Sequence, residues 1–212
     1  MKSAIPKQYL PVLGRPILLH VLTLFARMPA CEHVIVATDD DERLRELLRE
    51  GGLETAVEIV PGGARRQDSV AQAVSAVPDD DMIVLVHDAA RPCVEEHHVR
   101  DVAEAAARHD AALLAVRARD TLKEVRDGVI TRTLDRHTIW QAQTPQAARA
   151  GMFRAAIRHA TEAGITVTDD VALIEALGYP VQVVEGSHDN IKITQPGDLD
   201  IAAAVLRRMG RA

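Results

Sequence analysis

Short apolar runs alternate with amphipathic helical segments along most of this 212-residue chain, and this alternation limits the fold more than any other feature. The run 82–87 (MIVLVH) is apolar throughout, as a strand buried on both faces is. An order of strand, helix, strand, helix predicts an α/β fold with a mostly parallel sheet flanked by helices. The expected strands are 33–38, 56–60, 82–87, 111–116 and 181–185. The expected helices are 16–28, 40–50, 68–77, 98–109, 149–163, 169–177 and 198–209.

Residues 117–140 interrupt this alternation. Two polar runs, 121–125 and 129–134, flank the dipeptide Asp127-Gly128, which is typical of a tight hairpin turn. We expect this segment to form a β-arm that protrudes from the sheet. The chain length fits a single domain over 1–212.

Composition excludes several functional classes. The net charge is −6 and aromatic residues make up 2%, so neither a basic surface nor stacking platforms for nucleic acid are expected. No apolar stretch is long enough to span a membrane. The two cysteines form neither a disulfide framework nor a metal cluster, which favours a cytoplasmic location. With so few aromatic residues, the core must be built from Ala, Val, Leu and Ile.

Two loops that follow strands carry candidate chemistry. The loop 61–69 (PGGARRQDS) leads into a helix, and its glycines let backbone N–H groups approach an anion. The loop 87–93 (HDAARPC) follows the most apolar strand, where ligands of open α/β sheets bind. There Asp88 is a candidate ligand for Mg²⁺ and Arg91 a candidate phosphate clamp. The alternatives are an ordinary capped turn in the first loop and a structural Asp88–Arg91 pair in the second.

Lysines and acidic pairs elsewhere carry weaker signals. Lys7 and Lys192 are each flanked by turn-forming residues or short apolar runs, and taken singly both fit a solvated surface. The pair Asp169-Asp170 is typical of a helix N-terminus. No Gly-x-Ser-x-Gly motif is present, which disfavours a serine hydrolase.

Taken as an ordered set, the motifs resemble a known family. They are Pro-Lys-Gln-Tyr, Gly-Gly-x-x-Arg-x-Asp-Ser-Val, Val-His-Asp-Ala-Ala-Arg-Pro, Arg-Asp-Thr-Leu-Lys, Asp-Arg-x-x-x-Trp-x-x-Gln-Thr-Pro-Gln and Asp-Asn-Ile-Lys-Ile-Thr. From about Lys7 to the end, the chain resembles the 2-C-methyl-D-erythritol 4-phosphate cytidylyltransferases of the non-mevalonate isoprenoid pathway. The Asp-Ala-Ala-Arg-Pro and Thr-Pro-Gln pieces are shared with the ribitol-5-phosphate cytidylyltransferases, which remain the alternative.

This resemblance implies a nucleotide-binding, Rossmann-like sheet and transfer of CMP from CTP to methylerythritol phosphate, with Mg²⁺ and release of pyrophosphate. It implies a homodimer in which the arm 117–140 embraces the partner and shares the active site. The implied catalytic positions are Lys7, Asp88 and Lys192, with Asp88 as the metal ligand. The implied substrate-binding positions are Gly63, Ala64, Ser69, Arg91, Thr121, Arg136, Thr144 and Asp189.

The chain departs from the family pattern at its start. The resemblance implies a first strand and a loop of the type Ala-Ala-Gly-x-Gly-x-Arg-Met around the triphosphate, and no such loop precedes Lys7. We therefore expect a late start or a truncated gene, and weak or no activity until upstream residues are restored. The third hypothesis, beside the two cytidylyltransferase families, is that the chain is an inactive nucleotide-binding form.

Overall fold

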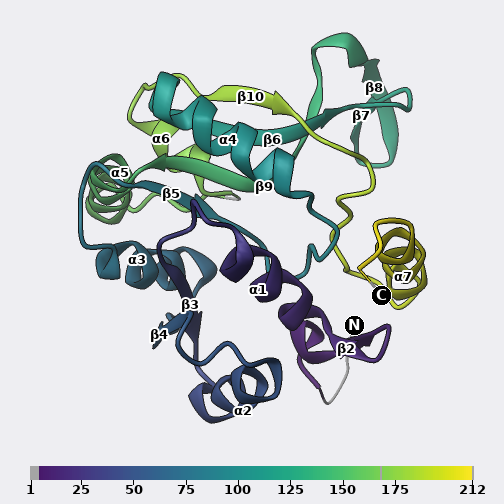
Figure 1. Ribbon diagram of the computed structural model, residues 1–212. Helices are drawn as coiled ribbons and strands as arrows, with labels where there is room; N and C mark the ends of the chain where they lie inside the picture. Colours follow the sequence, from purple (N-terminus) through teal and green to yellow (C-terminus); the bar gives the residue numbers. More distant parts are fainter. Residues whose placement is uncertain (1–4, 168, 212) are drawn as a thin grey trace.

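The computed structural model describes residues 5–167 and 169–211, and its centre is a four-stranded sheet (Figure 1). The strand order is β10 (Gln182–Glu185), β6 (Ala111–Arg117), β9 (Trp140–Arg149) and β5 (Ile83–Val86). Strand β10 pairs with β6 in parallel, whereas β9 is antiparallel to both β6 and β5. A second sheet pairs β3 (Val34–Thr38) with β4 (Val57–Pro61) in parallel. The predicted α/β class is confirmed, with β9 as its one reversed strand among the described residues of these two sheets.

Helices cover both faces of the four-stranded sheet. Side chains alternate between these faces along each strand, so neighbouring residues pack against different helices. Ala112 and Ala147 pack in a cluster with α1 and α4, whereas their neighbours Ala111 and Ala148 pack with α3, α5 and α6. The buried side chains are mainly Ala, Val, Leu and Ile, as the composition predicts. The long helices are α1 (Ile17–Arg27), α2 (Asp41–Gly51), α3 (Arg66–Ala76), α4 (Glu96–His109), α5 (Ala150–Glu162) and α7 (Asp198–Arg208). Shorter elements are η1 (Lys7–Tyr9), β1 (Pro11–Val12), β2 (Arg15–Pro16), η2 (Arg136–Thr138) and α6 (Val171–Ala176).

Strand β9 is the main element that the sequence does not predict. It passes through Pro145, whose missing N–H is unfavourable inside a sheet, so the pattern indicates a turn there. The structure accommodates Pro145 at an irregularity in the β6–β9 pairing. Leu113 lies opposite Gln146 and Ala115 opposite Ala142, so extra residues of β9 are looped out between these two pairs. The Thr144–Pro145 peptide bond in this bulge is cis.

The arm is present as a hairpin of β7 (Lys123–Arg126) and β8 (Val129–Thr133), a sheet of its own. Its turn residues Asp127 and Gly128 both have positive φ, as a tight hairpin turn of this kind requires. Figure 1 shows the hairpin extending away from the end of the main sheet. No described helix has the length and apolar character needed to cross a membrane.

Candidate active site

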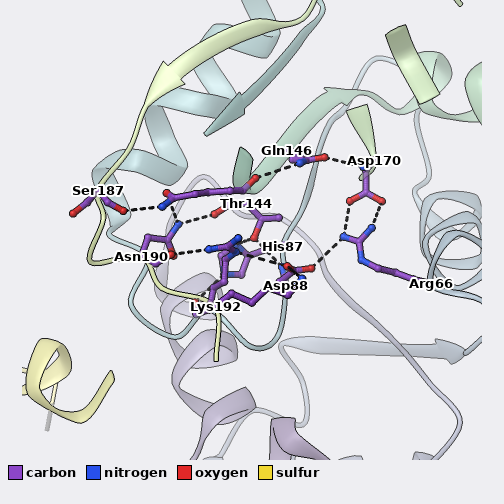
Figure 2. Close-up of polar contacts among 11 residues, drawn as sticks. Arg66, His87, Asp88, Thr144, Gln146, Asp170, Ser187, Asn190 and Lys192 are labelled. Carbon is purple, nitrogen blue, oxygen red and sulfur yellow. Dashed lines mark hydrogen bonds and ion pairs between the residues drawn. The ribbon is translucent and has the colours of Figure 1, made fainter. Parts of the chain in front are cut away.

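A cavity of about 230 Å³ opens where the loops after β5 and β10 meet the bulge of β9. Asp88 comes from the loop after β5, Thr144 from β9 and Lys192 from the segment after β10 (Figure 2). Arg91 lies on the same loop as Asp88. The carboxyl ends of parallel strands lie on one side of a sheet, which explains why segments so distant in sequence meet here. The lining residues are Arg66, Asp88, Arg91, Ala142, Gln143, Thr144, Gln146, Asp169 and Lys192.

Asp88 is surrounded by three cationic side chains. Its Oδ2 lies 2.7 Å from Nζ of Lys192 and 3.7 Å from Nε of Arg91, and its Oδ1 lies 3.2 Å from Nη2 of Arg66. Burial alone would raise the pKa of Asp88. The hydrogen bond from Lys192 and the three positive charges outweigh burial and lower its pKa below the usual value. Asp88 is therefore ionised, and the cavity carries an excess of positive charge.

A chain of hydrogen bonds fixes the backbone of Asp88. The backbone N–H of Asp88 donates to Oγ1 of Thr144 over 3.0 Å. Nε2 of His87 lies 3.1 Å from the carbonyl oxygen of Arg91, so Nε2 carries the hydrogen and Nδ1 is an acceptor. The Thr144 hydroxyl, 3.0 Å from Nδ1, must then donate to it. Burial lowers the pKa of His87 to about 4, which keeps the ring neutral and preserves this direction of the chain.

Arg66, the first residue of α3, joins the glycine loop to this cluster. Its Nη1 and Nη2 lie 2.8 and 2.7 Å from the two carboxylate oxygens of Asp170. Oε1 of Gln146 accepts hydrogen bonds from the backbone N–H groups of Asp170 and Val171, which ties this acidic residue to β9. Burial raises the pKa of Asp170 although Arg66 opposes that change.

The segment that carries Lys192 is held by buried amides. Nε2 of Gln143 donates to the carbonyl of Ser187, and Nδ2 of Asn190 donates to the carbonyl of Thr144. Arg91 donates through Nη1 to the carbonyl of Asn190 over 2.8 Å. These bonds position the segment before Lys192 against β9 and the loop after β5. Nε of Arg91 is buried and has no hydrogen-bond partner among the described residues.

The loop before α3 requires glycine at position 63. A Cβ atom on Gly63 would lie 2.3 Å from Cβ of Asp68 and 2.8 Å from the backbone nitrogen of Ser69. With no side chain there, the backbone N–H of Gly63 donates to Oγ of Ser69 over 2.9 Å. Ala64 is exposed on the same loop. Gly63 and Ala64 therefore lie in one tight turn, and Ser69 lies in the helix α3 that follows it and begins at Arg66.

The remaining predicted residues do not line this cavity. Lys7 is exposed in η1, its side chain without a hydrogen bond or ion pair in the described part of the chain, and Thr121 is exposed before β7. Arg136 donates through Nη1 to the carbonyl of Arg119. Asp189 pairs with Arg208 of α7. The structure thus gathers Asp88, Arg91, Thr144 and Lys192 and leaves these four apart.

Several residues of the site were not predicted. Arg66 belongs to the Gly-Gly-x-x-Arg motif and His87 to the Val-His-Asp motif, but neither motif indicates what these two residues do. The pair Asp169-Asp170 indicates a helix N-terminus, and Asp170 does directly precede α6. Thr168, just before this pair, lies outside the described residues. Gln143, Gln146 and Asn190 also stand inside quoted motifs, but only the fold shows that they are buried and what they bind.

An α/β sheet with a glycine loop, an ionised carboxylate and several cations at its strand ends defines a protein that binds phosphorylated substrates. The family model described as "IspD: 2-C-methyl-D-erythritol 4-phosphate cytidylyltransferase" matches residues 1–208. The chain belongs to this family. It is an enzyme of the cytidylyltransferase class, acts on 2-C-methyl-D-erythritol 4-phosphate and serves isoprenoid synthesis.

Individual relatives agree with the family model. The 2-C-methyl-D-erythritol 4-phosphate cytidylyltransferase of Bacillus velezensis is 39% identical over 210 residues, which cover 98% of this chain and 90% of the relative. That of Acidobacterium capsulatum is 43% identical over 210 residues, covering 96% and 88%. The crystal structure of the enzyme from Thermus thermophilus superposes with a TM-score of 0.83 at 36% identity, covering 97% of this chain and 96% of that one.

Proposed function

We propose that the cavity around Asp88 is where CMP passes from CTP to 2-C-methyl-D-erythritol 4-phosphate. The observation that carries this proposal is the convergence of Asp88, Arg91 and Lys192 from two distant loops on one cavity. Two anionic substrates have to approach each other in this reaction. Fixed cations offset their repulsion and stabilise the charge that develops during transfer.

In the proposed reaction, a phosphate oxygen of the acceptor attacks the α-phosphorus of CTP and pyrophosphate leaves. The attacking phosphate is already anionic, so no strong general base is required. Lys192 and Arg91 bind and orient phosphate oxygens. The Nε–H of Arg91 forms no hydrogen bond among the described residues and lies 3.7 Å from Oδ2 of Asp88, so it is a donor available for one of these oxygens. The turn at Gly63 and Ala64, together with Ser69 in the helix that follows, binds the cytidine portion.

The residues of the cavity fit a bound Mg²⁺. Asp88 and Asp169 both line it, and Mg²⁺ prefers one or two carboxylates together with water and phosphate oxygens. Asp88 would hold the ion, which supplies charge neutralisation and orientation of the phosphates. The cations around Asp88 are unfavourable for a free metal ion, because they repel it. They favour a metal ion that arrives with anionic phosphates, which offset this repulsion.

We also propose a homodimer whose active sites are shared. Thr121 and Arg136 lie on or beside the arm and do not line the cavity of their own chain. As substrate-binding residues they would act in the cavity of the partner subunit. Lys7 is proposed to contact the triphosphate from η1, and Asp189 to contact the methylerythritol phosphate or the reacting phosphates from the segment before Lys192. The two free cysteines suit a cytoplasmic location.

Mg²⁺-dependent release of pyrophosphate from CTP tests the proposal, with methylerythritol phosphate or ribitol 5-phosphate as acceptor. Turnover with methylerythritol phosphate alone is expected, and Asp88→Asn should abolish it without loss of folding. Unchanged activity of Asp88→Asn, or preference for ribitol 5-phosphate, would contradict the proposal. CTP binding without turnover in the same assay would instead favour the hypothesis of an inactive nucleotide-binding form.

A further inference from the structure

Arg66 is shared between two carboxylates that have different surroundings. It forms a two-bond pair with Asp170 at 2.8 and 2.7 Å, and it reaches Asp88 with a single longer contact of 3.2 Å (Figure 2). Two parallel N–H···O bonds fix the plane of a guanidinium group far better than one does. The orientation of Arg66 is thus determined by Asp170.

Asp170 is itself rigidly placed. Its side chain is only 2% exposed, and its backbone N–H is bonded to the buried amide of Gln146 over 2.8 Å. An ionised carboxylate in such a position is retained only when it is paired, since burial of an unpaired charge is costly. Arg66 is its one ion-pair partner among the described residues. The pair therefore connects the start of α3, the start of α6 and strand β9.

The Arg66–Asp170 pair affects the balance of charge around Asp88. Lys192, Arg91 and Arg66 all face Asp88, and each positive charge repels a divalent cation approaching the same carboxylate. Asp170 offsets the charge of Arg66 and accepts two of the hydrogen bonds that Arg66 donates. Without Asp170, the guanidinium would be free to form a two-bond pair with Asp88 instead.

We propose that Asp170 is a positioning residue that limits Arg66 to a single long contact with Asp88 and so leaves Asp88 able to bind a divalent cation with the nucleotide. This inference rests on the proposed role of Asp88 as metal ligand. Asp170 touches neither the substrates nor the metal in this scheme, because its effect passes through Arg66.

Three variants test the proposal, with Mn²⁺ as a paramagnetic probe in place of Mg²⁺. Asp170→Asn keeps the shape and removes the charge, so the affinity for Mn²⁺ in the presence of CTP, measured by electron paramagnetic resonance, should fall about tenfold. The double variant Arg66→Gln/Asp170→Asn removes both charges and should bind Mn²⁺ within about threefold of the unaltered chain. The matched control is Asp80→Asn, which breaks the Arg154–Asp80 pair outside the cavity and should leave Mn²⁺ binding unchanged.

The opposite effects of the single and double variants separate this role from a loss of folding, and thermal unfolding checks that each protein is folded. Equal Mn²⁺ affinity of Asp170→Asn and the unaltered chain would overturn the inference. A double variant as weak as Asp170→Asn would also overturn it. A crystal structure of Asp170→Asn should show two hydrogen bonds from Arg66 to Asp88, and a guanidinium left in its present place would count against the proposal. If Asp88→Asn does not weaken Mn²⁺ binding, the proposed metal site itself fails, and this result is distinguishable from the others.

Discussion

Nζ of Lys192 lies 2.7 Å from Oδ2 of Asp88 and joins the segment after β10 to the loop after β5. This ion pair holds the lysine over the cavity and helps to keep Asp88 ionised. An anionic phosphate entering the cavity would compete with Asp88 for the ammonium group. The same contact therefore preorganises Lys192 and can be exchanged when the substrates bind.

Replacing Lys192 should abolish most of the activity. Lys192→Gln removes the charge that faces the phosphates, and a loss of about 100-fold or more in kcat is expected from the removal of one charged donor. Lys192→Arg keeps the charge but not the shape, and should retain more activity than Lys192→Gln. Pyrophosphate release measured with both variants checks this order, and the reverse order would show that the charge of Lys192 is not what matters.

Thr144 is expected to act through the backbone of Asp88. Thr144→Val removes the hydroxyl and leaves the N–H of Asp88 and Nδ1 of His87 unpaired, which should destabilise the fold by about 1–3 kcal/mol. Thr144→Ser preserves the hydroxyl and should stay within about 1 kcal/mol of the unaltered chain. Urea unfolding measures both. Similar losses in the two variants would indicate that the methyl group, not the hydroxyl, is what stabilises the fold.

Stability should fall as the pH is lowered, because His87 is neutral in the folded protein. Its pKa of about 4 lies below the ordinary value of 6.5 that it regains on unfolding, so protonation favours the unfolded chain. The stabilisation is complete above pH 6.5 and is lost progressively towards pH 4, by roughly 3 kcal/mol in all. Unfolding free energies measured between about pH 7.5 and 4.5 should show a shallower slope for His87→Gln. His109→Gln, at an exposed position, should keep the original slope; a matching slope in His87→Gln would contradict the neutral state of the ring.

A side chain at position 63 should displace the glycine loop. Gly63→Ala places Cβ against Asp68, and overpacking of this kind costs about 1–3 kcal/mol. CTP affinity measured by calorimetry should fall about tenfold, because the loop carries the proposed cytidine contacts. Gly197→Ala is the matched control, since no atom lies within 4 Å of its Cβ and its φ is −63°. Unchanged CTP affinity of Gly63→Ala would exclude this turn from the nucleotide site.

The arm should be required for dimerisation. Val125 and Ile130 lie opposite each other on the hairpin and are 53% and 59% exposed, an apolar pair that a partner subunit would cover. Ile130→Asp should convert the proposed dimer to a monomer in light scattering after gel filtration. Ile201→Asp changes an isoleucine of similar exposure on α7 and should leave the dimer intact. Dissociation by Ile201→Asp alone would place the interface elsewhere.

The sequence predicts the parts of this fold that depend on local pattern. The apolar run before His87 becomes β5, and Asp127-Gly128 becomes the hairpin turn, because burial and positive φ leave direct marks on residue type. Strand β9 is not predicted from the sequence, because Pro145 indicates a turn when only its neighbours along the chain are considered. Its place in the sheet depends on pairing with residues remote in sequence.

The candidate site divides in the same way. Asp88, Arg91 and Lys192 are marked by their position after strands or by the ordered motifs, and the structure brings them into one cavity. The contact between Asp170 and Gln146 is visible only in the structure, since an acidic residue before a helix is ordinary and the Thr-Pro-Gln motif does not show what Gln146 binds. The sequence does not indicate that Arg66 forms an ion pair with Asp170, which is remote from it along the chain.

The bulge in β9 makes the site sensitive to chain length more than to side-chain identity. Between Ala142 and Gln146 the strand carries more residues than β6 opposite it, and this excess places Thr144 under the backbone of Asp88. Removing one residue there would leave only one extra residue in β9 and turn the side chains on one side of the deletion to the opposite face of the sheet. Substitutions in this stretch leave the spacing intact, whereas a single-codon deletion would separate Gln146 from Asp170 and Thr144 from Asp88 at once.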